Sequence, residues 1–569
     1  MHPDSVMREE AQEADKAFVD LYSEVFSSSG VASNLSNLEA EGSIAEADSK
    51  RFGKIWKEDL RLGGAYLSDA SKAEVKRLSR EIAECTNEFE DNIRNDPIRL
   101  ELSAEELVGL PDDYLKNRTI NPSTQKTTVK FRPPERMFRF VCNEAAPANE
   151  DVLKRLLRLR HQKAIILGYS NSAELDLQDT IAKPPAEVAR FLDEVHDAIK
   201  PRAGREKSAI VELLKQKEGI DAQPWDILYG RALLKSHLLS GFNPKIARQY
   251  FQVARVFPAL QQIAQRLFSL RFEAIEGVDA WHPSVTASAV YDLAGGEEKL
   301  IGRIFFDIYP REGKNDGAAA YTARRPVDGE KLAEVILYAN MPDQPGACMS
   351  YDEVQTILHE LGHCAHALTA KQRYDRFAGI DSLPMDFVEA PSQMLELWLT
   401  DSSLFDFAVN DRGERIPQKL LDQLDAATAI GRGITKRSLM AMSKYCPEFH
   451  LRNPDNDVPT TDVVADIYRR YSNFPLVPGI SPHLSLGHIA AENYGSRLYS
   501  YLFSEVICHD IFSEFRKTGN LMDKDTAARY RKVILEKGSS QDPKDFIEEF
   551  LGRKYNSKAY MKWLNAGDL

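Results

Sequence analysis

The segment at residues 349–368, MSYDEVQTILHELGHCAHAL, restricts what this chain can fold into more than any other part of the sequence. Ser350 and Glu353 form an S-x-x-E capping box, which predicts that a helix begins here. Apolar residues then recur at helical spacing, at Val354, Ile357, Leu358, Leu361, Ala365 and Leu368. His359 and His363, four residues apart, project from one face of such a helix, about one turn apart. The segment therefore predicts an amphipathic helix that presents two imidazoles together.

This H-E-x-x-H spacing matches the chemistry of a catalytic metal. Two imidazoles one turn apart can bind one zinc ion at roughly 2.0–2.1 Å each. Glu360 lies beside the first histidine, where its carboxylate can take a proton from a water that the metal activates. The alternative is a pair of buried structural histidines, because a chain with 12 histidines can contain this pattern by chance. His366 is expected to pack or to support the site rather than to bind the metal.

A catalytic zinc usually has three protein ligands and one open position, so a third ligand is expected elsewhere in the chain. Residues 385–398, MDFVEAPSQMLELW, place Glu389 and Glu396 in an otherwise apolar, helix-forming stretch. A carboxylate in a buried stretch needs a partner or a metal. Either acid remains possible on this ground alone, and Asp386 is expected to cap a helix or to support the site.

The charge and the cysteines of the chain exclude several functional classes. A net charge of −13 argues against nucleic acid or an anionic membrane as the main partner. The six cysteines have no metal-binding or disulfide spacing, which is typical of a reducing compartment. No apolar run is long enough to span a membrane. Residues 1–50 are acidic, unlike a transit peptide, so we expect a cytoplasmic protein, with a mitochondrial location less favoured.

The apolar pattern divides the chain into a mainly helical body and a small β region. Residues 1–115 and 145–275 have helical periodicity, with a short strand expected within 120–140. A β-hairpin is predicted over 284–310 around Gly295-Gly296, with a further strand at 333–340, and the chain is mainly helical from 350 onward. We divide it into an N-terminal helical region, 1–130, and a catalytic region, 131–569.

Several segments resemble the thimet oligopeptidase family of zinc peptidases, which includes neurolysin and saccharolysin. The two-part signature is HELGHCAH followed by DFVEAPSQMLE. Further similar segments are WHPSV (281–285), FFDIYPREGK (305–314), LGHIAAENYGSRLYSYLFSEV (486–506) and EEFLGRK (548–554). The resemblance therefore extends from about residue 130 to the C-terminus.

The resemblance implies a fold and a site. The fold is mainly α, with two largely helical lobes flanking a deep substrate channel and a small sheet near the zinc helix, as in neurolysin-like zincins. The implied activity is zinc-dependent endoproteolysis of short unstructured peptides. We expect the enzyme to be a monomer. The implied cofactor is one Zn²⁺ bound by His359, His363 and Glu389. Glu360 is the implied general base. The groups implied to stabilise the substrate and the transition state are His488, Tyr494 and Tyr501. The strand at Val335–Met341 is expected to be an edge strand that pairs with the peptide.

The sequence also departs from the family pattern. Leu361 replaces the usual Phe of HEFGH, Leu498 stands where a tyrosine is usual, and the interval from His488 to Tyr494 is one residue longer. The stretch 314–320 lacks a histidine usual there, and the N-terminal region looks shortened. Two alternatives remain: a processing enzyme of the mitochondrial intermediate peptidase type, and a non-catalytic peptide-binding protein. The intact Glu360 argues against the second, because a structural zinc does not require a base.

Overall fold

The computed structural model describes residues 5–96, 101–103, 120–121, 126–128, 138–139, 141–143, 145–239, 242–314, 317–343, 346–456, 458–492 and 494–567. Its helices before the main sheet are α1 (Ser5–Phe26), α2 (Ser29–Ala40), α3 (Ala47–Leu62), α4 (Asp69–Arg94), α7 (Ala146–Ile166), α8 (Ser172–Asp176), α9 (Pro185–Glu218), α10 (Ile227–Leu238), α11 (Pro244–Arg248) and α12 (Val253–Phe268). Those after it are α13 (Tyr351–Thr369), α14 (Met385–Val388), α15 (Ala390–Glu396), α16 (Gln418–Ala429), α17 (Arg432–Leu451), α18 (Thr460–Tyr471), α19 (Gly487–Ala490), α20 (Ser500–Thr518), α21 (Lys524–Tyr530), α22 (Pro543–Leu551) and α23 (Lys558–Asn565), with short 3₁₀ turns between them.

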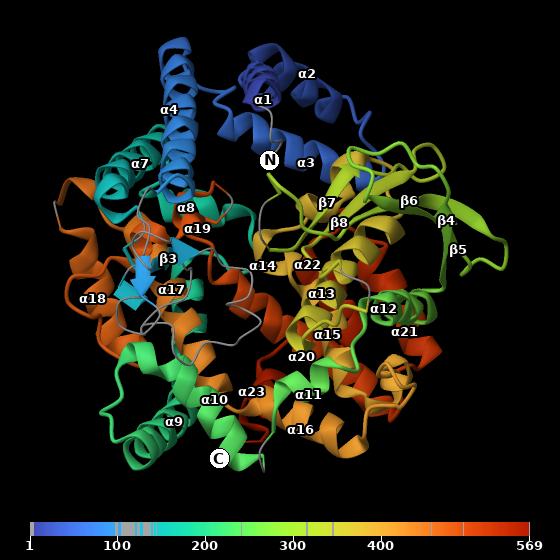
Figure 1. The fold of residues 1–569 in the computed structure, drawn as a ribbon. Coiled ribbons are helices and arrows are strands. Elements are labelled where there is room, and N and C mark those ends of the chain that lie inside the picture. Colours follow the sequence, from blue (N-terminus) through green and yellow to red (C-terminus); the bar gives the residue numbers. More distant parts are fainter. Residues whose placement is uncertain are drawn as a thin grey trace.

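Two separate apolar clusters organise these helices into two halves. The larger cluster joins the main sheet to α12, α13, α15, α20 and α22, and includes fully buried Trp398. The second joins α4 and α7 to α17 and α18 around Phe89 and Tyr445. Figure 1 shows α4, α7, α17 and α18 on the left and the sheet with α13 on the right. The predicted mainly helical fold with two lobes and a small sheet is confirmed.

The main sheet has five strands in the order β4-β5-β6-β8-β7. Their bounds are β4 (Leu270–Ile275), β5 (Thr286–Asp292), β6 (Lys299–Asp307), β7 (Ala319–Arg324) and β8 (Ala333–Tyr338). β5 and β6 form the predicted antiparallel hairpin, and β8 is the predicted strand at 333–340. The expectation that this strand is an edge strand is wrong, because β6 pairs with one side of it in parallel and β7 with the other in antiparallel. The edge next to β8 is therefore β7, which was not predicted.

Two further sequence predictions need correction. The helical pattern predicted over 145–275 ends early, because Ser269 adopts a left-handed conformation (φ 52°) after α12 and the chain continues into β4. Residues Glu101–Ser103 form strand β1, although 1–115 were predicted to be helical, because they pair with β3 (Lys126–Thr128). With β2 (Ile120–Asn121), β3 confirms a short strand within 120–140. The boundary at 130/131 lies outside the described residues and stays a prediction.

Helix α3 contacts both halves of the molecule. Near its start, Arg51 donates to the backbone oxygen atoms of Ser539 (3.1 Å) and Gln541 (3.2 Å), which precede α22. Near its end, Arg61 donates to the side chain of Gln178 (2.8 Å), which follows α8. The N-terminal helices are thus attached to segments from distant parts of the chain, and they do not form a separate body (Figure 1).

Candidate metal centre

Helix α13 begins where the capping box predicts. The Ser350 hydroxyl accepts the backbone N–H of Glu353 (3.1 Å), and the Glu353 carboxylate accepts the backbone N–H of Ser350 (2.5 Å). Because the helix is regular over this stretch, His359 and His363 stand one turn apart, with ring centroids separated by 5.0 Å. His363 is buried and His359 is half-buried. Two imidazoles are therefore presented together on one helix face.

The third residue comes from a break between two short helices. Glu389 follows α14 and precedes α15, and Pro391 occupies the first turn of the second helix. The Glu389 Oε2 atom lies 3.2 Å from Nε2 of His359 and 3.3 Å from Nε2 of His363. Across this group, the three candidate ligand atoms all lie within 4.8 Å of one another. The structure thus brings together the three residues that the sequence resemblance implies.

The electrostatics of this group favour an ionised carboxylate. Burial by itself would raise the pKa of Glu389, but hydrogen bonds from His359 and His363 outweigh burial and hold that pKa well below its usual range. The Ser392 hydroxyl also donates to Glu389 Oε2 (3.1 Å). Two imidazole nitrogens and a carboxylate oxygen that converge in this way form a donor set suited to zinc.

Glu396 has a different place from Glu389, which separates the two acids that the sequence left open. Its Oε1 atom accepts from Nδ1 of His359 at 2.5 Å, and its second oxygen accepts from Gln355. A carboxylate on Nδ1 leaves Nε2 of His359 directed toward Glu389 and fixes the orientation of the ring. Glu396 therefore acts through His359, a role that the sequence did not predict.

The carboxylate of Glu360 has no hydrogen-bond partner among the described residues. The residue is only 6% exposed, and no donor of the described chain uses the lone pairs of its carboxylate. Burial raises the pKa of Glu360, and the neighbouring histidines oppose this shift. A carboxylate whose proton affinity is raised by burial is suited to accept a proton.

His488, Tyr494 and Tyr501 lie together beside this group. The rings of His488 and Tyr494 are 4.8 Å apart, and those of Tyr494 and Tyr501 are stacked at 5.7 Å. The Tyr501 hydroxyl donates to the Tyr494 hydroxyl (3.1 Å), which leaves the proton of Tyr494 for another acceptor. Burial raises the pKa of both tyrosines, and the nearby charge of Glu389 acts in the same direction. Both phenols are therefore protonated donors at neutral pH.

Buried Arg160, on α7, fixes the segment that carries His488. Its guanidinium donates to the carbonyl oxygens of Ile489 (2.9 Å) and Ala490 (2.5 Å). Leu498, which stands where the family has a tyrosine, is buried in the apolar cluster of this half. Because α7 supports this segment while α13 carries the histidine pair, the candidate site is assembled from both halves.

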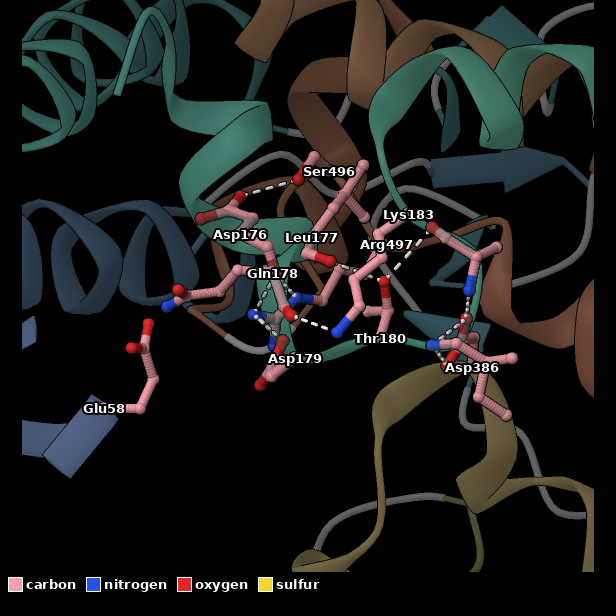
Figure 2. Close-up of polar contacts among 12 residues, drawn as sticks. Glu58, Asp176, Leu177, Gln178, Asp179, Thr180, Lys183, Asp386, Ser496 and Arg497 are labelled. Carbon is pink, nitrogen blue, oxygen red and sulfur yellow. Dashed lines mark hydrogen bonds and ion pairs between the residues drawn. The ribbon is translucent and has the colours of Figure 1, made fainter. Parts of the chain in front are cut away.

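Asp386 fastens the metal segment to the chain between α8 and α9. It is fully buried and accepts the backbone N–H groups of Ile181 (2.9 Å) and Ala182 (2.8 Å) and the hydroxyl of Tyr499 (3.1 Å). Figure 2 shows this carboxylate facing the loop. Asp386 therefore holds a loop and does not contact the metal group, and the expectation that it caps a helix or supports the site stays a prediction.

The same loop is held from its other side by the segment that precedes Tyr499. Arg497 donates to the carbonyl oxygen of Asp176 (2.7 Å) and to the carboxylate of Asp179 (2.9 Å). Ser496 donates to the side chain of Asp176 (2.7 Å), and all three contacts are visible in Figure 2. No local sequence motif marks these contacts, since they join residues more than three hundred positions apart.

His366 and Cys364 belong to the packed side of α13. Both are buried, and Nε2 of His366 has no hydrogen-bond partner in the described structure. Burial lowers the pKa of His366 to about 3, so its ring is neutral at neutral pH. These residues therefore pack against the interior, as was expected for His366.

A cavity of about 1060 Å³ opens beside the candidate metal centre. Gln393, Glu396, His488 and Tyr501 line it on the side of the metal centre, and residues of α10, α11, α13, α16, α17 and α20 line most of the rest. A cavity of this size is ample for several residues of an extended peptide.

Comparison with known proteins identifies the family. The sequence profile described as Peptidase family M3 matches residues 135–566. The chain belongs to Peptidase family M3. It is accordingly a metallopeptidase that hydrolyses peptide bonds, and the resemblance to thimet oligopeptidases is confirmed.

Curated relatives of this M3 peptidase cover most of its length. Oligopeptidase A of Escherichia coli (strain K12) is 26% identical over 87% of this chain and 78% of its own. The thimet-like oligopeptidase of Dictyostelium discoideum is 27% identical over 89% and 80%. A mitochondrial intermediate peptidase of Arabidopsis thaliana is 23% identical over 97% and 83%. Both branches that the sequence suggested are therefore among its relatives.

Solved structures agree on the fold of this M3 peptidase. The Trypanosoma cruzi metallocarboxypeptidase 1 matches with a TM-score of 0.57 at 12% identity, covering 100% of this chain and 93% of its own. Within the described part of the chain, no helix combines the length and the apolar character needed to cross a membrane. All six cysteines lie in that part, and each is free.

Proposed function

We propose that this M3 peptidase is a zinc-dependent endopeptidase that cleaves short unstructured peptides. One observation carries the proposal: the Glu389 carboxylate lies within 3.3 Å of Nε2 of both His359 and His363, beside a Glu360 carboxylate that has no partner in the described structure. This donor set fits a single zinc ion, and Glu396 already holds His359 in the orientation that a ligand needs. When bound there, zinc supplies Lewis acidity toward the scissile carbonyl and toward water.

The remaining steps are assigned to residues of the chain. Glu360 accepts a proton from the attacking water and returns it to the leaving amine. Tyr494 donates a hydrogen bond to the developing oxyanion of the scissile carbonyl, supported by Tyr501, which donates to it. His488 lies against Tyr494 and binds the same end of the peptide. Electrostatic stabilisation by one such donor is worth roughly 3–4 kcal/mol of the barrier.

The shape of the site supports the substrate class. The cavity lies between segments of the two halves, and its volume of about 1060 Å³ suits a short extended peptide. We also propose that the protein acts in the cytoplasm as a monomer, in peptide catabolism. Free cysteines and the acidic composition support a reducing compartment. A processing role of the mitochondrial intermediate peptidase type is the alternative, and localisation of the native protein separates the two.

The test combines metal content with hydrolysis of a quenched fluorescent peptide library. Glu360→Gln is expected to keep one zinc per chain, measured by atomic emission, and to lose cleavage. His359→Ala is expected to lose both, because a ligand is removed. Full activity in a clean Glu360→Gln preparation would contradict the mechanism. Zinc binding without cleavage of any peptide by the wild type would instead indicate a peptide-binding protein.

A further inference from the structure

The wall of the substrate cavity is basic in a protein that is acidic overall. The chain has a net charge of −13, yet the cavity is lined by more basic than acidic side chains. The basic residues are Arg231, Lys235, Lys245, Arg248, Arg432 and Lys436, and the acidic ones are Asp352, Glu396, Asp425 and Glu505. This local reversal of charge bears on which peptides the cavity accepts.

Two of the four acids are already committed to other partners. Glu396 accepts from His359, and buried Glu505 pairs with Lys436 at 2.6 Å. The other two, Asp352 and Asp425, are exposed to solvent, where water screens their charge. Lys436 is therefore neutralised by Glu505, whereas no carboxylate pairs with Arg231, Lys235 or Arg432 among the described residues.

Lys235 is the clearest unneutralised charge in this wall. It is half-buried on α10, and no carboxylate lies within ion-pair distance of it among the described residues. Arg231 lies one turn earlier on the same helix and donates to the hydroxyl of Thr435 (2.7 Å), which is not a charged partner. Burial lowers the pKa of Lys235, and Arg231 adds to this while Asp352 opposes it. An anion in the cavity would supply the negative partner that Lys235 lacks.

Arg432 extends the basic wall from the facing helix. Its guanidinium donates to the carbonyl oxygen of Trp563 (2.6 Å) and lies 4.1 Å from the centre of the Trp563 ring. In the described structure no carboxylate pairs with it, and burial lowers its pKa to about 10, so it is charged at neutral pH. Helix α17 begins at this residue, which places the positive end of the helix dipole at the same wall.

We propose that Arg231, Lys235 and Arg432 form a subsite that binds a carboxylate of the peptide substrate. The carboxylate is either an acidic side chain or the free C-terminus, since both present the same planar anion to a guanidinium. The subsite rests on the proposed peptidase function, because it continues the cavity that begins at Gln393 and Tyr501. It makes this enzyme favour peptides that place a carboxylate in this part of the cavity.

Matched peptide pairs test the subsite. One series carries Glu or Gln at successive positions on either side of the scissile bond of a neutral peptide. A second pair ends in a free carboxylate or in an amide, which distinguishes the two sources. The wild type is expected to favour the charged member of one series by about tenfold in kcat/KM, the effect of one charge-assisted hydrogen bond. The preference is expected to shrink at high salt.

Variants assign the preference to the wall. Lys235→Met keeps the apolar stem and removes the charge, and it is expected to lose most of the preference. Arg432→Met is expected to act in the same direction, and Lys235→Glu to favour a Lys-containing peptide. Lys217→Met removes an exposed charge on α9 outside the cavity and is expected to behave as the wild type. Circular dichroism and thermal unfolding verify that each variant is folded.

Peptide affinity measured in the Glu360→Gln background separates this proposal from the proposed activity. If the wild type cleaves no peptide but the Glu360→Gln protein binds charged members more tightly, the peptidase function fails and the subsite stands. The subsite is overturned if the charged and the neutral peptides of each matched pair are cleaved and bound equally well. It is also overturned if Lys235→Met and Arg432→Met leave the preference for the charged peptide unchanged.

Discussion

The contact between His359 and Glu396 provides the most demanding test of the metal centre. Glu396→Ala removes the acceptor of the Nδ1 hydrogen bond, which is 2.5 Å long, and leaves the three proposed ligands in place. A hydrogen bond to a charged group is worth about 1.5–3 kcal/mol. Because these side chains are 22% and 19% exposed, the lower part of that range applies. The zinc dissociation constant is therefore expected to rise about 10- to 30-fold.

Competition with a fluorescent chelator measures this change without relying on turnover. Glu396→Gln is the matched variant, since its amide oxygen can still accept from Nδ1 without a negative charge, and it is expected to fall between the wild type and Glu396→Ala. Glu360→Gln provides the control for a nearby acid that is not expected to bind or orient a ligand. Wild-type zinc affinity in a folded Glu396→Ala protein would refute the argument that this carboxylate orients His359.

Two further predictions concern the tyrosines and the buried aspartate. Tyr494→Phe is expected to lower kcat by about 100- to 1000-fold with little change in zinc content. Tyr501→Phe is expected to have a smaller effect, because Tyr501 acts through Tyr494. Equal kcat values for Tyr494→Phe and the wild type in steady-state kinetics would exclude the role assigned to Tyr494. Burial raises the pKa of Asp386 from 3.8 to about 6, so the folded state binds this proton more tightly than the unfolded state. The protonated group therefore adds to the free energy of unfolding below pH 4, and this contribution is lost as the pH rises through 6. Relative to Asp386→Asn, the wild type is expected to lose about 2.4 kcal/mol of unfolding free energy between pH 4 and pH 7 in urea titrations, and parallel pH curves would contradict this.

Some features of the fold could be predicted because their causes are local. The start of α13 depends on Ser350 and Glu353, three residues apart, and the β5–β6 hairpin depends on a glycine pair between two apolar runs. The strand β7 could not be predicted in this way. Three of its six residues are alanines and none is fully buried, and its place at the sheet edge depends on pairing with β8. The same pairing overturned the expected edge position of β8.

The sequence by itself determined the relation between His359 and His363. Two residues four positions apart on a regular helix have a fixed spatial relation, so this half of the metal centre follows from backbone geometry. The sequence also determined the family, through motifs spread along most of the chain.

The residue pattern alone left open which acid faces the two imidazoles; the family resemblance implied Glu389, and the tertiary structure supplied the physical reason. Glu389 and Glu396 are both carboxylates in one apolar stretch, and their sequence neighbours do not distinguish them. The break between α14 and α15 turns Glu389 toward both Nε2 atoms, while the next turns bring Glu396 to Nδ1 of His359. The basic cavity wall likewise arises where α10 and α17 meet. Such arrangements depend on the packing of distant segments, which no local pattern encodes.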